Sequence, residues 1–142
     1  MTFANDPKYD EFAVVGFIEK VTCILENTKK VVNARIDTGA TKSSIDEALV
    51  KELNIGPVVG ERIIRNAHGS ERRKVVRIQV QVAGKTTTAK FTVANRSQLK
   101  YQMLIGRNVL RKGFLIDPTK KIDAKPKEQT LLEQHFKQLR MK

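Results

Sequence analysis

The ten residues 31–40 have the sequence Val-Val-Asn-Ala-Arg-Ile-Asp-Thr-Gly-Ala, and they are the most informative stretch for the fold. Apolar and polar side chains alternate from Val31 to Ile36, which predicts a strand with one buried face. Asp37 follows this strand directly, and Gly39 permits the tight backbone that a turn needs. The stretch therefore predicts a strand that delivers one carboxylate, that of Asp37, to a turn.

Short strands separated by turns are predicted along most of the chain. Residues 12–25 are rich in apolar and β-branched residues, and they predict one bent strand or two short ones, broken at Gly16. The sequence Asn-Ala-His-Gly-Ser at residues 66–70 is a turn signal between two further strands. The other predicted strands are residues 61–65, 74–82, 86–94, 103–106 and 114–116. This pattern predicts a mainly β fold, either a small barrel or a sandwich.

Two short helices are predicted among these strands. Ser44 and Glu47 have the spacing of a capping box, which predicts a helix from Ser44 to about Leu53. Residues 107–112 predict a single helical turn, ended by the glycine that follows.

The C-terminal region has a different character from the strands. A basic linker with two prolines precedes residues 128–142, whose apolar side chains recur at helical spacing. We therefore predict a barrel domain over residues 1–120, and a linker with a C-terminal helix over residues 121–142.

Length and composition place the chain among ordinary globular proteins. Its 142 residues suffice for one domain with its own core, and no apolar run reaches the roughly 20 residues that span a bilayer. Residues 1–11 lack the layout of a secretory signal, and the single cysteine, Cys23, cannot form an intrachain disulfide. We interpret Cys23 as a small core residue. These features predict a cytoplasmic protein with no membrane partner.

The net charge is strongly positive. Lys and Arg number 27 against 15 acidic residues, which gives +12, and such a surface attracts anions. No nucleic-acid-binding motif accompanies the charge, so nucleic acid is not the predicted partner. Residues 61–77 carry six basic side chains against two acidic ones, which favours an acidic polypeptide if this segment lies over a cleft.

A second stretch gives Asp37 its context. Residues 104–110 form an apolar run that ends in Gly-Arg-Asn and then continues as Val-Leu. Together with Asp37-Thr38-Gly39, this segment resembles the retropepsins, the retroviral-type aspartic proteases. In that family each subunit supplies one catalytic aspartate from its Asp-Thr-Gly loop, and the Ile-Gly-Arg-Asn segment packs beside it. The resemblance implies a small closed β-barrel with one or two short helices.

A more extensive resemblance covers residues 14–120, about three quarters of the chain. This region is similar to a bacterial and archaeal family labelled ATP-dependent zinc proteases and also called retropepsin-like aspartic peptidases. Family members are often linked to ATP-grasp ligases that add glutamate to proteins, an association that names no substrate. The matching stretches are residues 34–40, 69–76, 95–97, 103–110 and 114–118.

The chemistry that the resemblance implies needs two carboxyl groups about one hydrogen bond apart, sharing one proton. One carboxylate takes a proton from water, and the protonated partner donates to the carbonyl oxygen of the peptide. No other Asp of this chain is followed by Thr-Gly. The resemblance therefore implies an aspartic endopeptidase that acts as a homodimer on polypeptides, with one Asp37 from each subunit.

The resemblance also implies roles for residues around Asp37. Thr38 would bond across to the partner loop, and Gly39 would let a backbone approach the substrate. The expected substrate-binding residues are Ala40, Thr41, Ala67, His68, Gly69 and Arg107. Of these, the three around His68 would form the tip of a flap, the hairpin that closes over substrate, and His68 is interpreted as an exposed turn residue.

One position departs from the retroviral pattern. Retroviral enzymes place an acid shortly after Asp-Thr-Gly-Ala, where it pairs with the arginine of Gly-Arg-Asn. Thr41 and Lys42 stand at those positions here. We therefore expect Arg107 to find another partner or to face solvent.

No metal or cofactor is predicted, in spite of the zinc and ATP in the family label. A catalytic zinc site needs three ligands drawn from His, Cys and carboxylates, and this chain has two His and one Cys. It contains no His-Glu-x-x-His, no Cys-x-x-Cys and no Gly-x-x-x-x-Gly-Lys-Ser/Thr loop.

Three alternatives remain open from the sequence. The chain could be a catalytically idle retropepsin-like module that binds peptides or mediates dimerisation. It could be a basic nucleic-acid-binding barrel, in which Asp-Thr-Gly is an accident. The motif could also be a plain turn, since Asp and Gly are common in turns.

Overall fold

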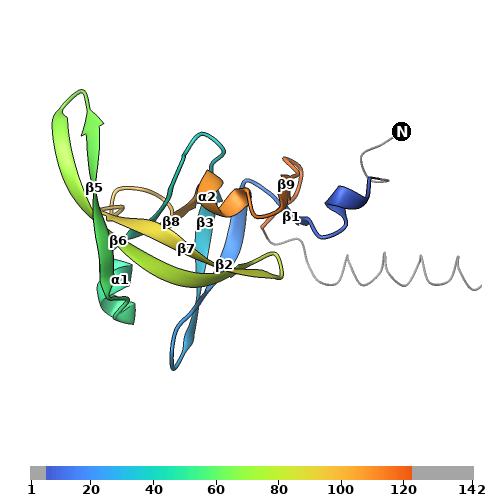
Figure 1. Ribbon diagram of the computed structural model, residues 1–142, viewed down its shortest axis with the longest axis horizontal. Helices are drawn as coiled ribbons and strands as arrows, with labels where there is room; N and C mark the ends of the chain where they lie inside the picture. Colours follow the sequence, from blue (N-terminus) through green and yellow to red (C-terminus); the bar gives the residue numbers. More distant parts are fainter. Residues whose placement is uncertain (1–5, 123–142) are drawn as a thin grey trace, which may run out of the picture.

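The computed structural model describes residues 6–122, which form nine strands, two short α-helices and one 3₁₀ turn (Figure 1). The mainly β prediction is confirmed. The elements are η2 (Pro7–Tyr9), β1 (Ala13–Val15), β2 (Ile18–Ile24), β3 (Lys29–Ile36), β4 (Ser43–Asp46), α1 (Glu47–Leu53), β5 (Val58–Asn66), β6 (Gly69–Val82), β7 (Lys85–Ala94), β8 (Met103–Ile105), α2 (Arg107–Leu110) and β9 (Phe114–Ile116).

Six strands close into a barrel, and a seventh extends from it. The strand order is β2-β3-β8-β4-β7-β6-β5, and a further pairing of β2 with β6 closes the ring. β6 is long enough to serve two purposes, because its second half pairs with β2 and β7 while its first half pairs only with β5. The β5–β6 hairpin therefore stands out from the barrel, at the left of Figure 1.

The core fills the barrel as strand alternation predicts. In the second half of β6 every other side chain is buried, and the residues between them face solvent. Burying each such Val or Ile contributes about 1.5–3 kcal/mol relative to leaving it exposed. Cys23 is fully buried among them, and burial raises the pKa of its thiol to about 11, so the thiol stays protonated at neutral pH.

One predicted helix start is wrong. The chain forms strand β4 from Ser43 to Asp46, and the helix begins only at Glu47. β4 is buried along its whole length because it pairs with β7 on one side and β8 on the other. The carboxylate of Asp46 accepts the backbone N–H of Arg96 instead of capping α1. Tertiary pairing thus overrides the capping-box signal.

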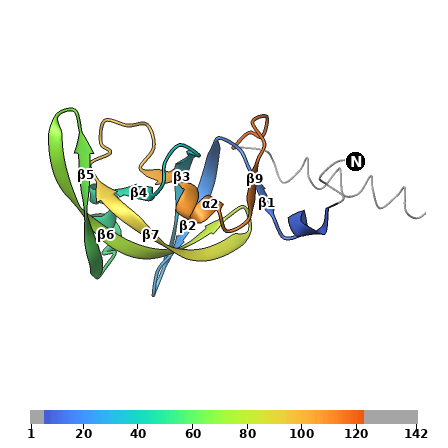
Figure 2. The ribbon, with the colours of Figure 1, turned by 45° about the horizontal axis from the view of Figure 1, so that its top comes forward.

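The chain ends of the described region are joined to each other beside the barrel. β1 and β9 form a two-stranded parallel sheet (Figures 1 and 2). Residues 12–25 thus form two strands, the second of the two predicted alternatives. The buried carboxylate of Glu19 accepts hydrogen bonds from the backbone N–H of Gly16 (2.7 Å) and from Lys120 Nζ (2.7 Å), which fastens the segment after β9 to the barrel.

The predicted C-terminal helix and the predicted domain boundary at residue 120 concern the end of the chain, beyond the last strand. The C-terminal helix over residues 128–142 lies outside the described residues, so it and the proposed domain boundary stay predictions. Within residues 6–122, no helix has both the length and the apolar character needed to cross a membrane.

Candidate active site

Asp37 lies where the sequence predicts, in a tight turn directly after β3. Its backbone N–H donates to the carbonyl oxygen of Ile105 (2.9 Å), so the first residue of the loop is still hydrogen-bonded to the neighbouring strand β8. One carboxylate oxygen, Oδ1, accepts the backbone N–H of Gly39 at 2.8 Å. The backbone N–H of Ala40 donates to the Asp37 carbonyl at 3.3 Å. The loop thus holds the carboxylate by its own backbone, with the side chain partly exposed.

The Gly-Arg-Asn segment packs against this loop. The backbone N–H of Arg107 donates to the Ala40 carbonyl (2.8 Å), and that of Asn108 donates to the Thr41 carbonyl (3.2 Å). A side chain at Gly106 has no room, because a Cβ there would clash with the Lys42 carbonyl and lie 2.8 Å from the Ala40 carbonyl oxygen. Glycine is therefore required at this point by close backbone approach.

Two side chains that the sequence analysis did not assign to the site complete this packing. The buried hydroxyl of Ser43 donates to Asn108 Oδ1 (2.7 Å) and accepts the backbone N–H of Gly106 (2.9 Å). Asn108 also donates from Nδ2 to the Lys90 carbonyl (2.9 Å). The signal that could have found them was weak: a serine four residues after Gly39, and an asparagine directly after Gly-Arg.

Arg107 has found other partners than an acid. Its Nη1 donates to the Thr38 carbonyl (3.1 Å) and its Nη2 to the Thr41 hydroxyl (3.0 Å). Its Nε is buried without a hydrogen-bond partner in the described part of the chain. The guanidinium therefore braces the two sides of the Asp37 loop, and Thr41 takes the place of the retroviral acid.

The hairpin predicted around Ala67-His68-Gly69 is present as β5 and β6, and its role as a flap stays a prediction. Its tip is the turn Ala67-His68, closed by a backbone pair between Asn66 and Gly69. Gly69 has φ +123°, a conformation that favours glycine, and all three tip residues are exposed. In Figures 1 and 2 the hairpin tip and the β3–β4 connection that carries Asp37 rise on the same side of the barrel. His68 is an exposed turn residue at the tip. Within residues 6–122 it forms no hydrogen bond with Asp37.

The basic side chains of the hairpin divide between its two faces. Arg62 and Arg73 face each other across the two strands, and both are partly buried. Their neighbours along the strands, including Ile63 and Arg72, are exposed, as alternation requires. The inner face of the hairpin therefore carries Arg62 and Arg73, and these two line a cavity of about 260 Å³ together with Thr41 and other residues of the Asp37 loop.

No set of metal ligands accompanies the loop. Over residues 6–122, His, Cys, Asp and Glu side chains nowhere gather in a group of three that could hold a metal ion.

Comparison with known families decides the assignment. Residues 48–127, more than half of the chain, match the RimB-like family, described as retropepsin-like aspartic endopeptidase RimB. The chain belongs to this family. The resemblance inferred from the Asp-Thr-Gly and Gly-Arg-Asn segments is therefore confirmed.

Solved structures show the same fold. A Legionella pneumophila protein of unknown function is 22% identical with a TM-score of 0.57, and the match covers 80% of this chain and 98% of that one. The protease of equine infectious anaemia virus (EIAV), solved with the inhibitor HBY-793, gives 20% identity and a TM-score of 0.53 over 67% of this chain and 85% of that one. The simian foamy virus protease gives 19% and 0.50 over 66% and 91%. The closed retropepsin-like barrel is confirmed.

Curated relatives have a different name. A protein of Desulfotalea psychrophila named "Probable alpha-L-glutamate ligase" is 30% identical over 112 residues, which is 61% of this chain and 24% of that protein. A Shewanella pealeana protein of the same name is 27% identical over 113 residues, 62% and 25%. This chain thus spans about a quarter of the length of these relatives.

Proposed function

We propose that this protein is an aspartic endopeptidase that works as a homodimer, with Asp37 of each copy forming the catalytic pair. The observation that carries the proposal is the bracing of the Asp37 loop. The backbone N–H of Gly39 and the carbonyl of Ile105 hold Asp37 by hydrogen bonds. The backbone N–H groups of residues 107–108 donate to the carbonyls of the same loop. The Gly39 bond alone is a turn bond that recurs at Asn66 and Asn95, but the support of the Asp37 loop by a second segment of the chain goes beyond what a plain turn needs and is typical of a positioned catalytic group.

One carboxylate does not suffice for the reaction. Hydrolysis by this route needs a carboxylate that accepts a proton from water and a carboxylic acid that donates one to the peptide oxygen. Two carboxyl groups one hydrogen bond apart share a single proton, since both cannot be ionised at that separation. Each chain offers one Asp-Thr-Gly loop, so a two-fold axis between two Asp37 loops supplies the second group.

We further propose that the substrate is an acidic polypeptide. Arg62 and Arg73 lie on the face of the hairpin turned toward the Asp37 loop, where their charge acts on a bound peptide. The relatives named as glutamate ligases carry a segment similar to this chain within a longer protein. Both observations support a substrate rich in carboxylates.

The Asp37→Asn variant tests the proposal. Asparagine keeps the hydrogen-bond geometry and removes the titrating carboxyl, so peptide cleavage should fall at least about 100-fold, the usual contribution of acid–base catalysis. Cleavage of glutamate-rich peptides by the full chain is the measurement, with Asp10→Asn, at an exposed aspartate, as the matched control.

Two further arms make the test specific. Specific activity should fall on dilution, because separated subunits have one carboxyl each, and chelators should leave it unchanged. Full activity in Asp37→Asn, or in a monomer at every concentration, contradicts the proposal. A wild-type protein that binds acidic peptides and cleaves none points to the idle binding module instead.

A further inference from the structure

The cavity beneath the flap has an unusual charge. It measures about 260 Å³ and adjoins the Asp37 loop through Ala40 and Thr41. Four of the side chains that line it are basic, those of Lys42, Arg62, Arg73 and Arg96, and none is acidic. Like charges gathered around one cavity repel each other, and an anion within it relieves that repulsion.

Arg96 is the most constrained of the four. It is 9% exposed, and three of its nitrogens are already engaged. The backbone N–H donates to Asp46 Oδ1 (2.8 Å), Nε donates to the Tyr101 carbonyl (2.9 Å), and Nη1 donates to the Ser44 hydroxyl (3.1 Å). The guanidinium is therefore held in one orientation before any ligand arrives.

The carboxylate of Asp46 acts on this buried charge but does not form an ion pair with it. Among residues 6–122, no ion pair within 4.0 Å includes Arg96, and Nη2 donates no hydrogen bond to the protein. A buried arginine is costly unless it is paired. Burial lowers the pKa of Arg96, Asp46 opposes this effect, and Arg73 adds to it. A carboxylate in the cavity would offset the burial and the repulsion together.

Arg73 and Arg62 provide the second side of the cavity. They are cross-strand partners on the inner face of the hairpin, so the flap brings both above the loop. Arg73 donates from Nε to Glu71 Oε1 (2.7 Å), which leaves its Nη groups for another acceptor. Arginine forks bind a carboxylate by two parallel hydrogen bonds, which is the geometry that distinguishes an acid from its amide.

We propose that this cavity is a subsite for an acidic side chain of the bound peptide, and that Arg96 is its specificity-determining residue, assisted by Arg73. The proposal rests on the proposed function for the peptide nature of the ligand. The carboxylate of a glutamate or aspartate next to the Asp37 loop enters the cavity from the open side and pairs with the guanidinium of Arg96. An amide side chain of the same size leaves the buried charge unpaired and binds more weakly.

Binding, measured without cleavage, tests the subsite. In the full chain with Asp37→Asn, fluorescence anisotropy gives the affinities of labelled hexaglutamate and hexaglutamine. Replacing Arg96 or Arg73 by Gln should lower the preference for hexaglutamate about tenfold to a hundredfold, as expected for hydrogen bonds between charged groups. Hexaglutamine binding should stay within about twofold, which a merely structural role does not predict.

Matched variants keep the test decisive. Arg72→Gln removes the same charge from the outer face of the same hairpin, where the side chain is 77% exposed, and should change the preference less than about twofold. Because Arg96→Gln also removes bonds to Ser44 and Tyr101, Arg73→Gln carries the test if that variant fails to fold.

The outcomes separate this proposal from the proposed function. An unchanged preference in folded Arg73→Gln, or an equal loss in Arg72→Gln, overturns the subsite. A protein that loses its preference in Arg73→Gln alone of these two, and whose wild-type form cleaves no peptide, supports the subsite and overturns the peptidase.

Discussion

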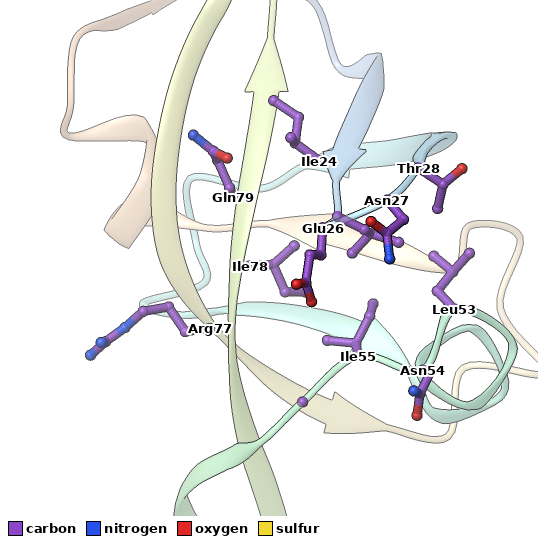
Figure 3. Close-up of a pocket in the computed structure, with 12 residues that line it drawn as sticks. Ile24, Glu26, Asn27, Thr28, Leu53, Asn54, Ile55, Arg77, Ile78 and Gln79 are labelled. Carbon is purple, nitrogen blue, oxygen red and sulfur yellow. The ribbon is translucent and has the colours of Figure 1, made fainter.

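The barrel has a cavity at each end, and the two differ in what lines them. The larger, about 350 Å³, lies between the β2–β3 hairpin, the end of α1 and β6 (Figure 3). Isoleucine and leucine side chains line it together with polar ones, among them Glu26, Asn27 and Gln79, and Arg77 extends away. The smaller, about 260 Å³, adjoins the Asp37 loop and has four basic side chains.

The volume of a cavity does not distinguish the end of the barrel that holds the Asp37 loop. The eight residues of β3 join the two ends, so about 26 Å of strand separates them. At the larger cavity, the hairpin between β2 and β3 is a simple exposed turn. At the smaller, the loop after β3 is braced by Ser43, Gly106 and Arg107, and the buried Arg96 forms no ion pair with another residue of the range 6–122. Constraint and unpaired charge, rather than volume, distinguish the end at which we propose the active site.

The largest expected effect is the difference between adding one methyl group at the Asp37 end of the barrel and adding one at the opposite end. Gly106→Ala pushes a Cβ into the Lys42 and Ala40 carbonyls and displaces the Asp37 loop, whereas Gly56, at the larger cavity, has nothing within 4 Å of such a Cβ. We expect Gly106→Ala to lower the free energy of unfolding by about 1–3 kcal/mol and to remove most activity. Gly56→Ala should leave activity unchanged.

Urea unfolding and peptide cleavage of the two variants check this expectation. Equal losses of stability and activity in the two variants would contradict the expectation, because they would show that the backbone is packed equally tightly at both ends of the barrel.

A smaller effect is expected on assembly. The carbonyl of Phe17 accepts the backbone N–H of Ile36, so the backbone of Phe17 lies next to the residue that precedes Asp37, and its aromatic side chain is 56% exposed. The proposed two-fold axis through the Asp37 loop would bring Phe17 to the interface, whereas Val31, 55% exposed, lies toward the other end of β3. Phe17→Ser should weaken the dimer at least about fivefold, since buried aromatic anchors commonly contribute more than 1 kcal/mol.

Sedimentation over a range of concentrations measures the dimer constant. Val31→Ser is the control, with no expected change. A dimer weakened by Val31→Ser and not by Phe17→Ser would place the interface at the wrong end for two Asp37 carboxyls to meet.

The sequence predicted some features of the fold and the candidate site and missed others. Strand alternation predicted most of the barrel because each strand has one buried face, and a glycine after an aspartate predicted the turn. Residues 44–46 of β4 were mistaken for the start of a helix, because their capping-box spacing was the only local signal in a strand that is buried throughout and shows no alternation. Arg96 was missed because its burial depends on Asp46 and Ser44, which lie fifty residues earlier in the chain. Contacts of that range have no local signal.

The distance between the two Asp37 carboxyl groups in a structure of the assembled protein tests the central claim most directly. If the pair is catalytic, their nearest oxygens lie about 2.6–3.2 Å apart across a two-fold axis. A dimer that holds them further apart than about 6 Å, where they no longer share a proton, would contradict the account.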